Sequence, residues 1–213
     1  RFGPREIRNY STRYSGWGGS LQKGYWDINQ YKRLLDDLSM SDCGDVDVAY
    51  YDIERNRKII TQTVKKILKA GTLPGVIGGD HSITYPCICA FEDFKSLDII
   101  QIDAHLDWID EVDGIRYANG SPMRRSMELD FTNKMVQLGI RCIRSRESDY
   151  NFAKLQGSQI FTRQDIRQKG VDEIVEKLSP LGNVYVSIDI DGLDPSIAPG
   201  TGSPTVDGLL YYE

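Results

Sequence analysis

One strand-like run that ends in polar side chains constrains this chain more than any other feature. Residues Leu97-Asp98-Ile99-Ile100-Gln101-Ile102 are mostly apolar and rich in β-branched residues, which is typical of a buried strand. The run continues into Asp103-Ala104-His105-Leu106-Asp107, with an acid, an imidazole and a second acid at alternate positions. If the chain stays extended, this period of two places all three on one face. Such donors at the carboxyl end of a strand predict a metal site, whereas the alternative is a polar strand end that enters a loop.

Two further segments carry the same kinds of side chain. Val76-Ile77-Gly78-Gly79 reads as a short strand and a turn, and it leads into Asp80-His81-Ser82, where a helix is expected to begin. Val184–Ile188 reads as a third apolar strand, which continues into Asp189-Ile190-Asp191 and stops in the turn Gly192-Leu193-Asp194-Pro195. Extended backbone would again place the two acids of Asp-x-Asp on one face.

The donors of these three segments suit two divalent cations better than one. The chain has only two histidines, and both lie beside acids at predicted strand ends. A single Zn²⁺ site uses fewer carboxylates, because zinc prefers nitrogen and sulfur ligands. Two cations that share bridging carboxylates fit the set better. The candidate metal ligands are His81, Asp103, His105, Asp107, Asp189 and Asp191.

Strand-like and helix-like patterns alternate along the chain, which predicts a parallel α/β sheet. Apolar residues at i, i+4, i+7 and i+8 from Ile60 predict a helix that ends near Gly71. Residues 108–120 show no period and predict a functional loop. Further helices are expected from Phe2 with Pro4 in the first turn, from Ser82 to Phe91, after Ser121-Pro122 with Ser121 as N-cap, and around Val171–Leu178. Further strands are expected at Met135–Arg141 and Gln159–Thr162, and residues 10–25 read as loop.

Charge and cysteine content narrow the class of protein. A net charge of −5 argues against generic binding to nucleic acid or to anionic membranes. No segment approaches the roughly 18 consecutive apolar residues of a membrane span. The four cysteines form no Cys-x-x-Cys pair, which favours free thiols over disulfides and a reducing, cytoplasmic location.

Three motifs in this order resemble those of the ureohydrolases, the family of arginase and agmatinase. They are Gly-Gly-Asp-His-Ser at 78–82, Asp-Ala-His-x-Asp at 103–107 and Ser-x-Asp-x-Asp-Gly-Leu-Asp-Pro at 187–195. The likeness runs from Phe2-Gly3-Pro4 to Gly202-Ser203-Pro204. It implies a three-layer α/β/α fold with a mainly parallel sheet, in a single domain over residues 1–213. Because the chain begins at Arg1 rather than Met, part of both termini is expected to be missing.

The resemblance also implies a cofactor and a reaction. In this family two Mn²⁺ ions per subunit activate water, which attacks a guanidino carbon and releases urea and an amine. The affinity order of divalent metals also allows Ni²⁺ or Co²⁺. Because the family forms trimers and hexamers, a homo-oligomer is expected, with a hetero-oligomer as an alternative.

Carried over residue by residue, the resemblance assigns the donors to two ions. His81 and Asp107 are expected to hold the first ion, and His105 and Asp191 the second. Asp103 and Asp189 are expected to bridge both ions. Asp107 is also expected to be catalytic, because it can orient the attacking hydroxide. Asp80 and Asp194 are expected to be turn or supporting residues rather than ligands.

One departure from the family concerns proton transfer. Arginases and agmatinases carry a His-Gly-x-Pro segment whose histidine is thought to pass protons to the leaving amine. This chain has Asn119-Gly120-Ser121-Pro122 instead. Asparagine can donate and accept hydrogen bonds but does not titrate near neutral pH. A lost general acid typically costs about 10²–10⁴ in rate. Asn119 is nevertheless the residue expected to act at this position, as a catalytic group and a substrate contact.

A second departure concerns the substrate. Arginase follows its Gly-(Leu/Ile)-Arg with acids, one of which meets the α-amino group of arginine, whereas this chain places Arg144 there. This change from an acid to an arginine disfavours arginine as the substrate. If Arg144 points inward, the site would tolerate a neutral or anionic tail; the alternative is a solvated loop arginine. Ser121-Pro122-Met123-Arg124-Arg125 resembles the agmatinase branch. Ser121 and Ser203 are further expected substrate contacts.

Three functional hypotheses follow from these residues. The first is a binuclear-metal amidinohydrolase of the agmatinase-like branch, which converts a small guanidino compound other than arginine to an amine and urea. The second is a non-catalytic metal-binding subunit of a hetero-oligomeric ureohydrolase, motivated by Asn119. The third is hydrolysis of a formimino or amide bond, since related sheets host that chemistry.

Overall fold

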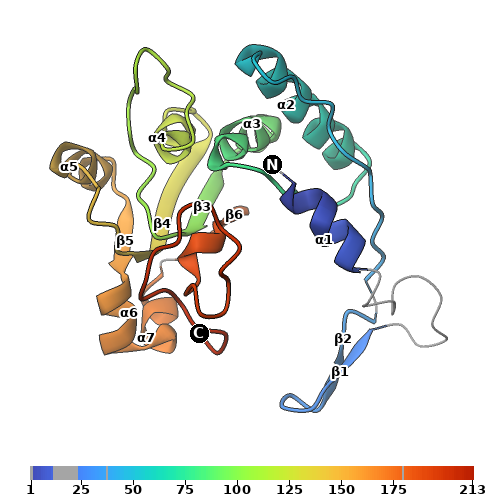
Figure 1. Cartoon of the computed structure of the whole chain (residues 1–213), viewed down its shortest axis with the longest axis vertical. Helices are drawn as coiled ribbons and strands as arrows, with labels where there is room; N and C mark the ends of the chain where they lie inside the picture. The colour runs from blue at the N-terminus through green and yellow to red at the C-terminus, as the bar shows by residue number, and fades with distance from the viewer. Residues whose placement is uncertain (1, 12–23, 37, 179) are drawn as a thin grey trace. The chain divides into compact units, whose positions relative to one another are not determined.

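The computed structural model describes residues 2–11, 24–36, 38–178 and 180–213 (Figure 1). By its internal contacts the chain divides into two units. The first comprises Arg1–Asp47 with Gly75–Gly79, and the second comprises Val48–Pro74 with Asp80–Glu213. The expected single domain over residues 1–213 stays a prediction.

The first unit contains a helix and a hairpin. Helix α1 spans Gly3–Ser11 and has Pro4 in its first turn, as predicted. Strands β1 (Tyr25–Asp27) and β2 (Lys32–Leu34) pair antiparallel. The predicted loop at 10–25 lies mostly outside the described residues, and its first two residues belong to α1 instead.

The strand predicted at Val76–Gly79 is wrong. These residues belong to the first unit, and they form no ladder with any strand among the described residues. Val76 and Ile77 are 45% and 56% exposed, so this apolar run is not a buried strand here. An apolar run alone cannot fix a strand, because a strand also needs a partner for its backbone groups.

The second unit is built on a four-stranded sheet in the order β5-β4-β3-β6, with all neighbours parallel. Its strands are β3 (Leu97–Ile102), β4 (Thr132–Ile140), β5 (Gln159–Thr162) and β6 (Val184–Ile188). All four match predicted strands to within three residues at each end. Because parallel neighbours need crossover connections, each return passes through helix, as the alternating patterns predict.

Helices connect these strands and precede them. Helix α2 (Ile53–Lys69) begins at the Asp52 cap and is followed by Gly71 at φ 72°, as predicted. The helix predicted from Ser82 to Phe91 is three short pieces, and it starts one residue earlier because the Asp80 side chain caps it. The pieces are η2 (His81–Ile83), α3 (Thr84–Ile88) and η3 (Cys89–Phe91). The later helices are α4 (Pro122–Met127), α5 (Glu147–Leu155), α6 (Arg163–Lys169) and α7 (Val171–Lys177), and η4 (Ile190–Gly192) follows β6.

Ser121 occupies the predicted N-cap position and Pro122 opens the helix, but the capping hydrogen bond expected of Ser121 is not formed. Ser121 has φ −118° and ψ −5°, and its side chain accepts no capping hydrogen bond. A capping residue usually has extended backbone that turns its oxygen toward the first free N–H groups, and Ser121 lacks that conformation.

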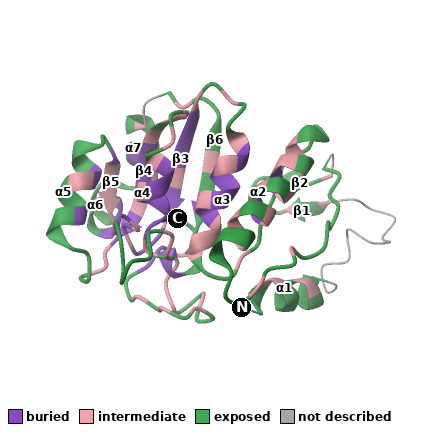
Figure 2. Ribbon diagram, turned by 90° about the horizontal axis from the view of Figure 1, so that it is seen from above, coloured by how far each residue is buried: buried purple, intermediate pink, exposed green. Residues whose placement is uncertain are grey.

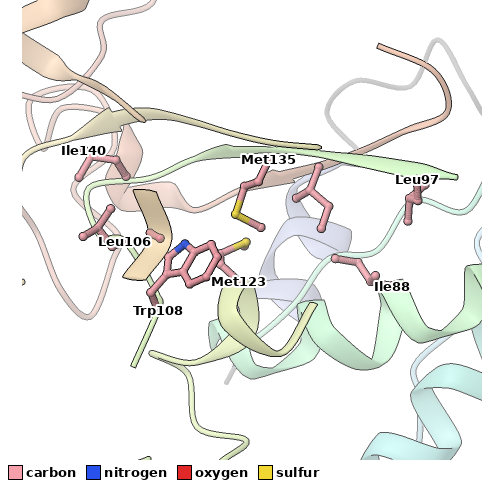
Figure 3. Packing of buried hydrophobic residues seen from close by; sticks show 9 residues of the cluster. Ile88, Leu97, Leu106, Trp108, Met123, Met135 and Ile140 are labelled. Atoms are coloured by element: carbon pink, nitrogen blue, oxygen red, sulfur yellow. The ribbon is translucent and has the colours of Figure 1, made fainter. Parts of the chain in front are cut away.

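Two apolar clusters lie on the two faces of the sheet. On one face, side chains of β3 and β4 pack with α3, α4 and α5, and Trp108 lies among them (Figure 3). On the other, Ile166 of α6 and Ile174 of α7 pack with Ile102, Leu138 and Phe161. Figure 2 shows the most buried residues along β3 and β4, between these layers. The predicted three-layer α/β/α fold with a parallel sheet is therefore confirmed.

Two other sequence predictions can be compared with the structure. All four cysteines are free thiols, as expected. None of the described helices is both long enough and apolar enough to cross a membrane.

Candidate metal centre

Strand register brings the predicted donors to one edge of the sheet. Ile102, the last residue of β3, pairs with Leu138 of β4 and with Ile188, the last residue of β6. Asp103 and Asp189 therefore follow directly at adjacent strand ends. The backbone N–H of Asp189 donates to the carbonyl of Ile102 (2.9 Å), which locks the two segments together.

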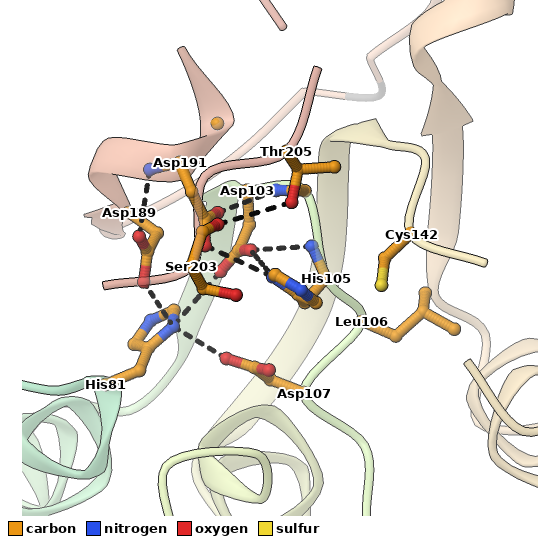
Figure 4. A network of polar contacts seen from close by, with 12 residues as sticks. His81, Asp103, His105, Leu106, Asp107, Cys142, Asp189, Asp191, Ser203 and Thr205 are labelled. Carbon is orange, nitrogen blue, oxygen red and sulfur yellow. Dashed lines mark hydrogen bonds and ion pairs between the residues drawn. The ribbon is translucent and has the colours of Figure 1, made fainter. Parts of the chain in front are cut away.

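The first donor group surrounds His81, which enters from η2 (Figure 4). Its Nδ1 lies 2.6 Å from Asp107 Oδ2, 3.1 Å from Asp103 Oδ2 and 3.5 Å from Asp189 Oδ2. Its Nε2 lies 2.8 Å from Ser187 Oγ. Ser187 therefore holds the outer ring nitrogen, and Nδ1 is the atom that faces the acids.

The second donor group surrounds His105. Its Nδ1 lies 3.4 Å from Asp103 Oδ1 and 3.3 Å from Asp191 Oδ2. Asp103 therefore belongs to both groups and offers a different oxygen to each, as a bridging carboxylate does. Asp189 belongs to the first group alone, so its predicted bridging role stays a prediction.

The donors converge, but extended backbone does not bring them together. Strand β3 ends at Ile102 and β6 at Ile188, before the donors begin. Asp107 has φ +55°, a left-handed conformation that aspartate adopts more readily than most residues. Its carbonyl accepts the N–H of Met123 (3.2 Å), which ties this turn to α4. The predicted period-two arrangement is thus wrong. One candidate group comprises His81, Asp103 and Asp189, and the other comprises Asp103, His105 and Asp191. Asp107 belongs to neither group and contacts His81, so its role as a ligand stays a prediction.

Burial and mutual proximity shift the pKa values of these groups. Burial opposes charging of His81, but the Asp103 and Asp107 carboxylates outweigh it and raise its pKa to about 10. Asp103 and Asp191 raise the pKa of His105 to about 11. Burial raises the pKa of Asp107 to about 6, and burial together with Asp103 raises the pKa of Asp189. Protons are retained here because clustered acids require compensating positive charge.

The donor set fits divalent cations. Two ligand atoms about 2.1 Å from one cation and about 90° apart lie about 3 Å from each other. The contacts of His81 and His105 with the acids span 2.6–3.5 Å. Nδ1 of His81 is buried yet aligned for a hydrogen bond with none of the acids that it faces. The metal-ligand roles stay a prediction, which this geometry supports.

One arginine organises the loop that carries Asp191. The Arg141 guanidinium donates to the carbonyls of Asp191 (2.6 Å), Thr205 (2.6 Å) and Val206 (2.8 Å). It thereby ties the end of β4 to both ends of the segment 191–206. Ser203, the predicted substrate contact, lies in this segment, is half-buried and is drawn with the donors in Figure 4.

Gly192 is required where this segment crosses the end of β3. An alanine Cβ at Gly192 would lie 3.0 Å from the backbone nitrogen of Asp103 and 3.1 Å from the carbonyl oxygen of Ile102. Gly192→Ala must push the two donor segments apart, so we expect it to lower the free energy of unfolding by about 1–3 kcal/mol. Urea titration of the metal-free protein measures this. Gly200→Ala is the control, because nothing lies within 4 Å of its added Cβ; equal stability of the two variants would contradict the expectation.

The aperiodic segment 108–120 is a loop, as predicted, and it is anchored at its neck and by Tyr117. The N–H of Ile109 donates to the carbonyl of Gly120 (2.9 Å), which closes the neck. Tyr117 stacks on Tyr85 with ring centroids 5.3 Å apart, and the Arg57 guanidinium lies 3.6 Å from its ring centre. Such cation–π contacts contribute about 0.5–2 kcal/mol each. The backbone on both sides of Asn119 is therefore held in place.

The other expected substrate contacts differ in accessibility. Asn119 is exposed on the loop, and its predicted contact with substrate stays a prediction. Ser121 is fully buried at 0% exposure, so a contact with substrate would require a rearrangement. Arg144 is exposed, which agrees with a solvated arginine rather than an inward-pointing one. Asp80 caps η2 and Asp194 accepts the N–H of Ser196 (2.9 Å), the turn roles expected of them.

Several supporting residues were not predicted. Gln101 donates to Asp103, Ser187 contacts His81, and Arg141 holds the Asp191 segment. One signal was present in the sequence: a glutamine inside an apolar β-branched run is rarely buried without a specific partner.

Comparison with known proteins identifies the family. The arginase family model matches residues 1–213. The guanidinobutyrase of Pseudomonas aeruginosa is 34% identical over 220 residues, which cover 100% of this chain and 66% of that protein. The mitochondrial agmatinase of Gallus gallus is also 34% identical, with coverages of 98% and 61%. The crystal structure of formimidoylglutamase from Bacillus subtilis matches with a TM-score of 0.81 and 30% identity, over 98% of this chain and 64% of that one. The chain thus spans about two thirds or less of the length of these relatives, and it belongs to the arginase family.

Proposed function

We propose that the protein is a binuclear-metal amidinohydrolase that converts a small guanidino compound to an amine and urea. The observation that carries this proposal is the sharing of Asp103 by two donor groups, one around His81 and one around His105. Four carboxylates and two imidazoles suit two Mn²⁺ ions, and Ni²⁺ or Co²⁺ are alternatives.

The residues divide the chemistry between them. A bound pair of divalent cations would supply a water-derived nucleophile at neutral pH. Asp107, 2.6 Å from Nδ1 of His81, can orient that nucleophile toward the guanidino carbon. The bond then breaks between this carbon and the nitrogen that attaches the guanidino group to the rest of the substrate. The oxygen of water becomes the oxygen of urea, and the released nitrogen leaves as an amine after gaining a proton. Asn119 can hydrogen-bond the reacting nitrogens but cannot supply that proton by titrating.

The substrate class proposed is agmatine-like amines or guanidino acids, rather than arginine. The curated relatives reported above are a guanidinobutyrase and an agmatinase, and their substrates share a guanidino group on a short chain. The position at which arginase places an acid for the α-amino group of arginine is Arg144 here. A site without that acid has no partner for the α-ammonium group, which disfavours arginine.

A urea-release assay tests the proposal. The protein is stripped with EDTA, reloaded with Mn²⁺, Ni²⁺ or Co²⁺, and incubated with 4-guanidinobutyrate, 3-guanidinopropionate, agmatine or arginine. Metal-dependent urea release from at least one of the first three, and less from arginine, is the expected result. Absence of urea with every substrate and every metal would contradict the proposal.

A second candidate activity is hydrolysis of a formimino group, because the matching structure in Bacillus subtilis is a formimidoylglutamase. The same nucleophile would attack a formimino carbon and release formamide instead of urea. Product analysis distinguishes the two, since formamide carries one nitrogen and urea carries two. A non-catalytic subunit is less favoured, because the matched relatives carry enzyme names.

The assembly and location remain part of this proposal. The family leads us to expect a homo-oligomer, with a hetero-oligomer as the alternative, and the free thiols favour a cytoplasmic location. Light scattering of the purified chain at several concentrations measures the mass of the assembly.

A further inference from the structure

A chain of hydrogen bonds leads from the apolar core to the carboxylate shared by both donor groups. Nε1 of Trp108 donates to Oε1 of Gln137 (3.0 Å), and Nε2 of Gln137 donates to Oε1 of Gln101. Nε2 of Gln101 then donates to Oδ2 of Asp103 (2.8 Å). Both glutamines are 0% exposed and Trp108 is 1% exposed, so water does not compete for these groups.

The two ends of this chain of hydrogen bonds, which we call the relay (Trp108, Gln137, Gln101 and Asp103), fix its direction. An indole N–H can only donate, and an ionised carboxylate can only accept. Each amide between them must therefore present its oxygen toward Trp108 and its nitrogen toward Asp103. Hydrogen bonds that point the same way polarise one another, so the donor that reaches Asp103 is stronger than an isolated amide.

The same two amides also hold the backbone that carries the donors. Nε2 of Gln101 donates to the carbonyl of His105 (3.3 Å), and Nε2 of Gln137 donates to the carbonyl of Leu106 (2.8 Å). Ser158 Oγ donates to Oε1 of Gln137 (2.9 Å) as a second anchor. The two glutamine amides of the relay thus restrain the backbone between Asp103 and Asp107.

The orientation of the Asp103 carboxylate follows from these contacts. Gln101 engages Oδ2, the oxygen 3.1 Å from His81 Nδ1. The backbone N–H of His105 engages Oδ1 (2.6 Å), the oxygen on the side of the second group. With one donor on each oxygen, the carboxylate cannot rotate without breaking both hydrogen bonds.

We infer that Gln101, held in turn by Gln137 and Trp108, is a positioning residue that sets Asp103 in its bridging orientation between two cations. This inference rests on the proposed metal centre. Residues that orient metal ligands in this way typically contribute about 10–100-fold to metal affinity.

Metal titration of matched variants tests it. Gln101→Met keeps the length of the side chain and removes its donor. We expect the affinity for at least one Mn²⁺ ion, measured by calorimetry, to fall about 10–100-fold. Electron paramagnetic resonance should show weaker coupling between the two bound ions. Trp108→Phe removes only the first donor of the relay, while Ser158 still engages Gln137, and we expect a smaller loss in the same direction.

Asp98→Asn is the control for general damage to β3. Asp98 is 2% exposed at the opposite end of this strand, where it accepts the N–H groups of Lys134 (3.1 Å) and Gly182 (2.7 Å). We expect a lower melting temperature of the metal-free protein and unchanged Mn²⁺ affinity. An equal loss of affinity in Asp98→Asn and Gln101→Met would overturn the inference.

The remaining outcomes separate this inference from the proposed function. If the wild-type chain binds two ions and both relay variants bind them within twofold of wild type, the relay has no positioning role. If Gln101→Met does not fold, Trp108→Phe decides the question alone. If the wild-type chain binds no Mn²⁺, Ni²⁺ or Co²⁺, the metal centre itself is refuted and the inference with it.

Discussion

Replacement of Asp103 by asparagine is expected to abolish tight binding of both metal ions and to lower urea release by about 10²–10³-fold or more. Asp103 is the residue common to both donor groups, and each of its oxygens faces a different histidine. Asparagine keeps the shape but offers one oxygen and no charge, so it cannot bridge two cations. The variant also removes one of the acids that balance the charge of the cations.

The loss of bound metal in Asp103→Asn is measured as the metal content after dialysis, by inductively coupled plasma mass spectrometry. Asp80→Asn is the matched control, because Asp80 directly precedes His81 but is exposed and caps η2. The asparagine oxygen can still accept the N–H of Ser82, so full metal content is expected in the control. Two tightly bound ions in Asp103→Asn would show that the donors around His81 and His105 do not share this carboxylate.

The fold and the grouping of donors could be predicted because both depend on local patterns joined by one general rule. Apolar β-branched runs such as Leu97–Ile102 identify strands of a parallel sheet, and polar residues after such strands gather at its carboxyl edge. Asp103 and Asp189 follow paired strand ends and obey this rule. The family resemblance added the assignment of roles to each donor.

Other features depend on partners that are distant in sequence, and local patterns did not reveal them. Gln101 meets Gln137 across two neighbouring strands, and Arg141 meets carbonyls 50 to 65 residues later. The left-handed backbone of Asp107 arises where its turn is tied to α4 by Met123. Val76–Gly79 shows the converse, because its apolar run predicts a strand although no described strand pairs with it.

Introduction of histidine at position 119 is expected to raise the rate of urea release by about 10²–10⁴-fold, the usual contribution of a general acid. The leaving amine must gain a proton, and both histidines of the chain lie among the candidate metal ligands. Asn119 is exposed in a loop whose backbone is held by Tyr117 and Gly120. An imidazole in Asn119→His would therefore be carried by a stretch of backbone that is held in place on both sides.

The pH dependence of this gain identifies its cause. Only the protonated imidazolium can act as a general acid and transfer a proton to the leaving amine. The gain in rate should therefore diminish as pH rises above the pKa of the new imidazole, ordinarily about 6.5. Asn119→Gln is the control, because it retains an amide and adds no titrating group, and its pH profile should match that of wild type. A gain that does not vary with pH would point to altered substrate binding instead of proton transfer.

If Asn119→His is no faster than wild type, the substrate does not depend on a protein acid at this position, and Asn119 serves binding alone. Activity in Asn119→His but none in wild type would instead favour a subunit that binds metal and has lost turnover.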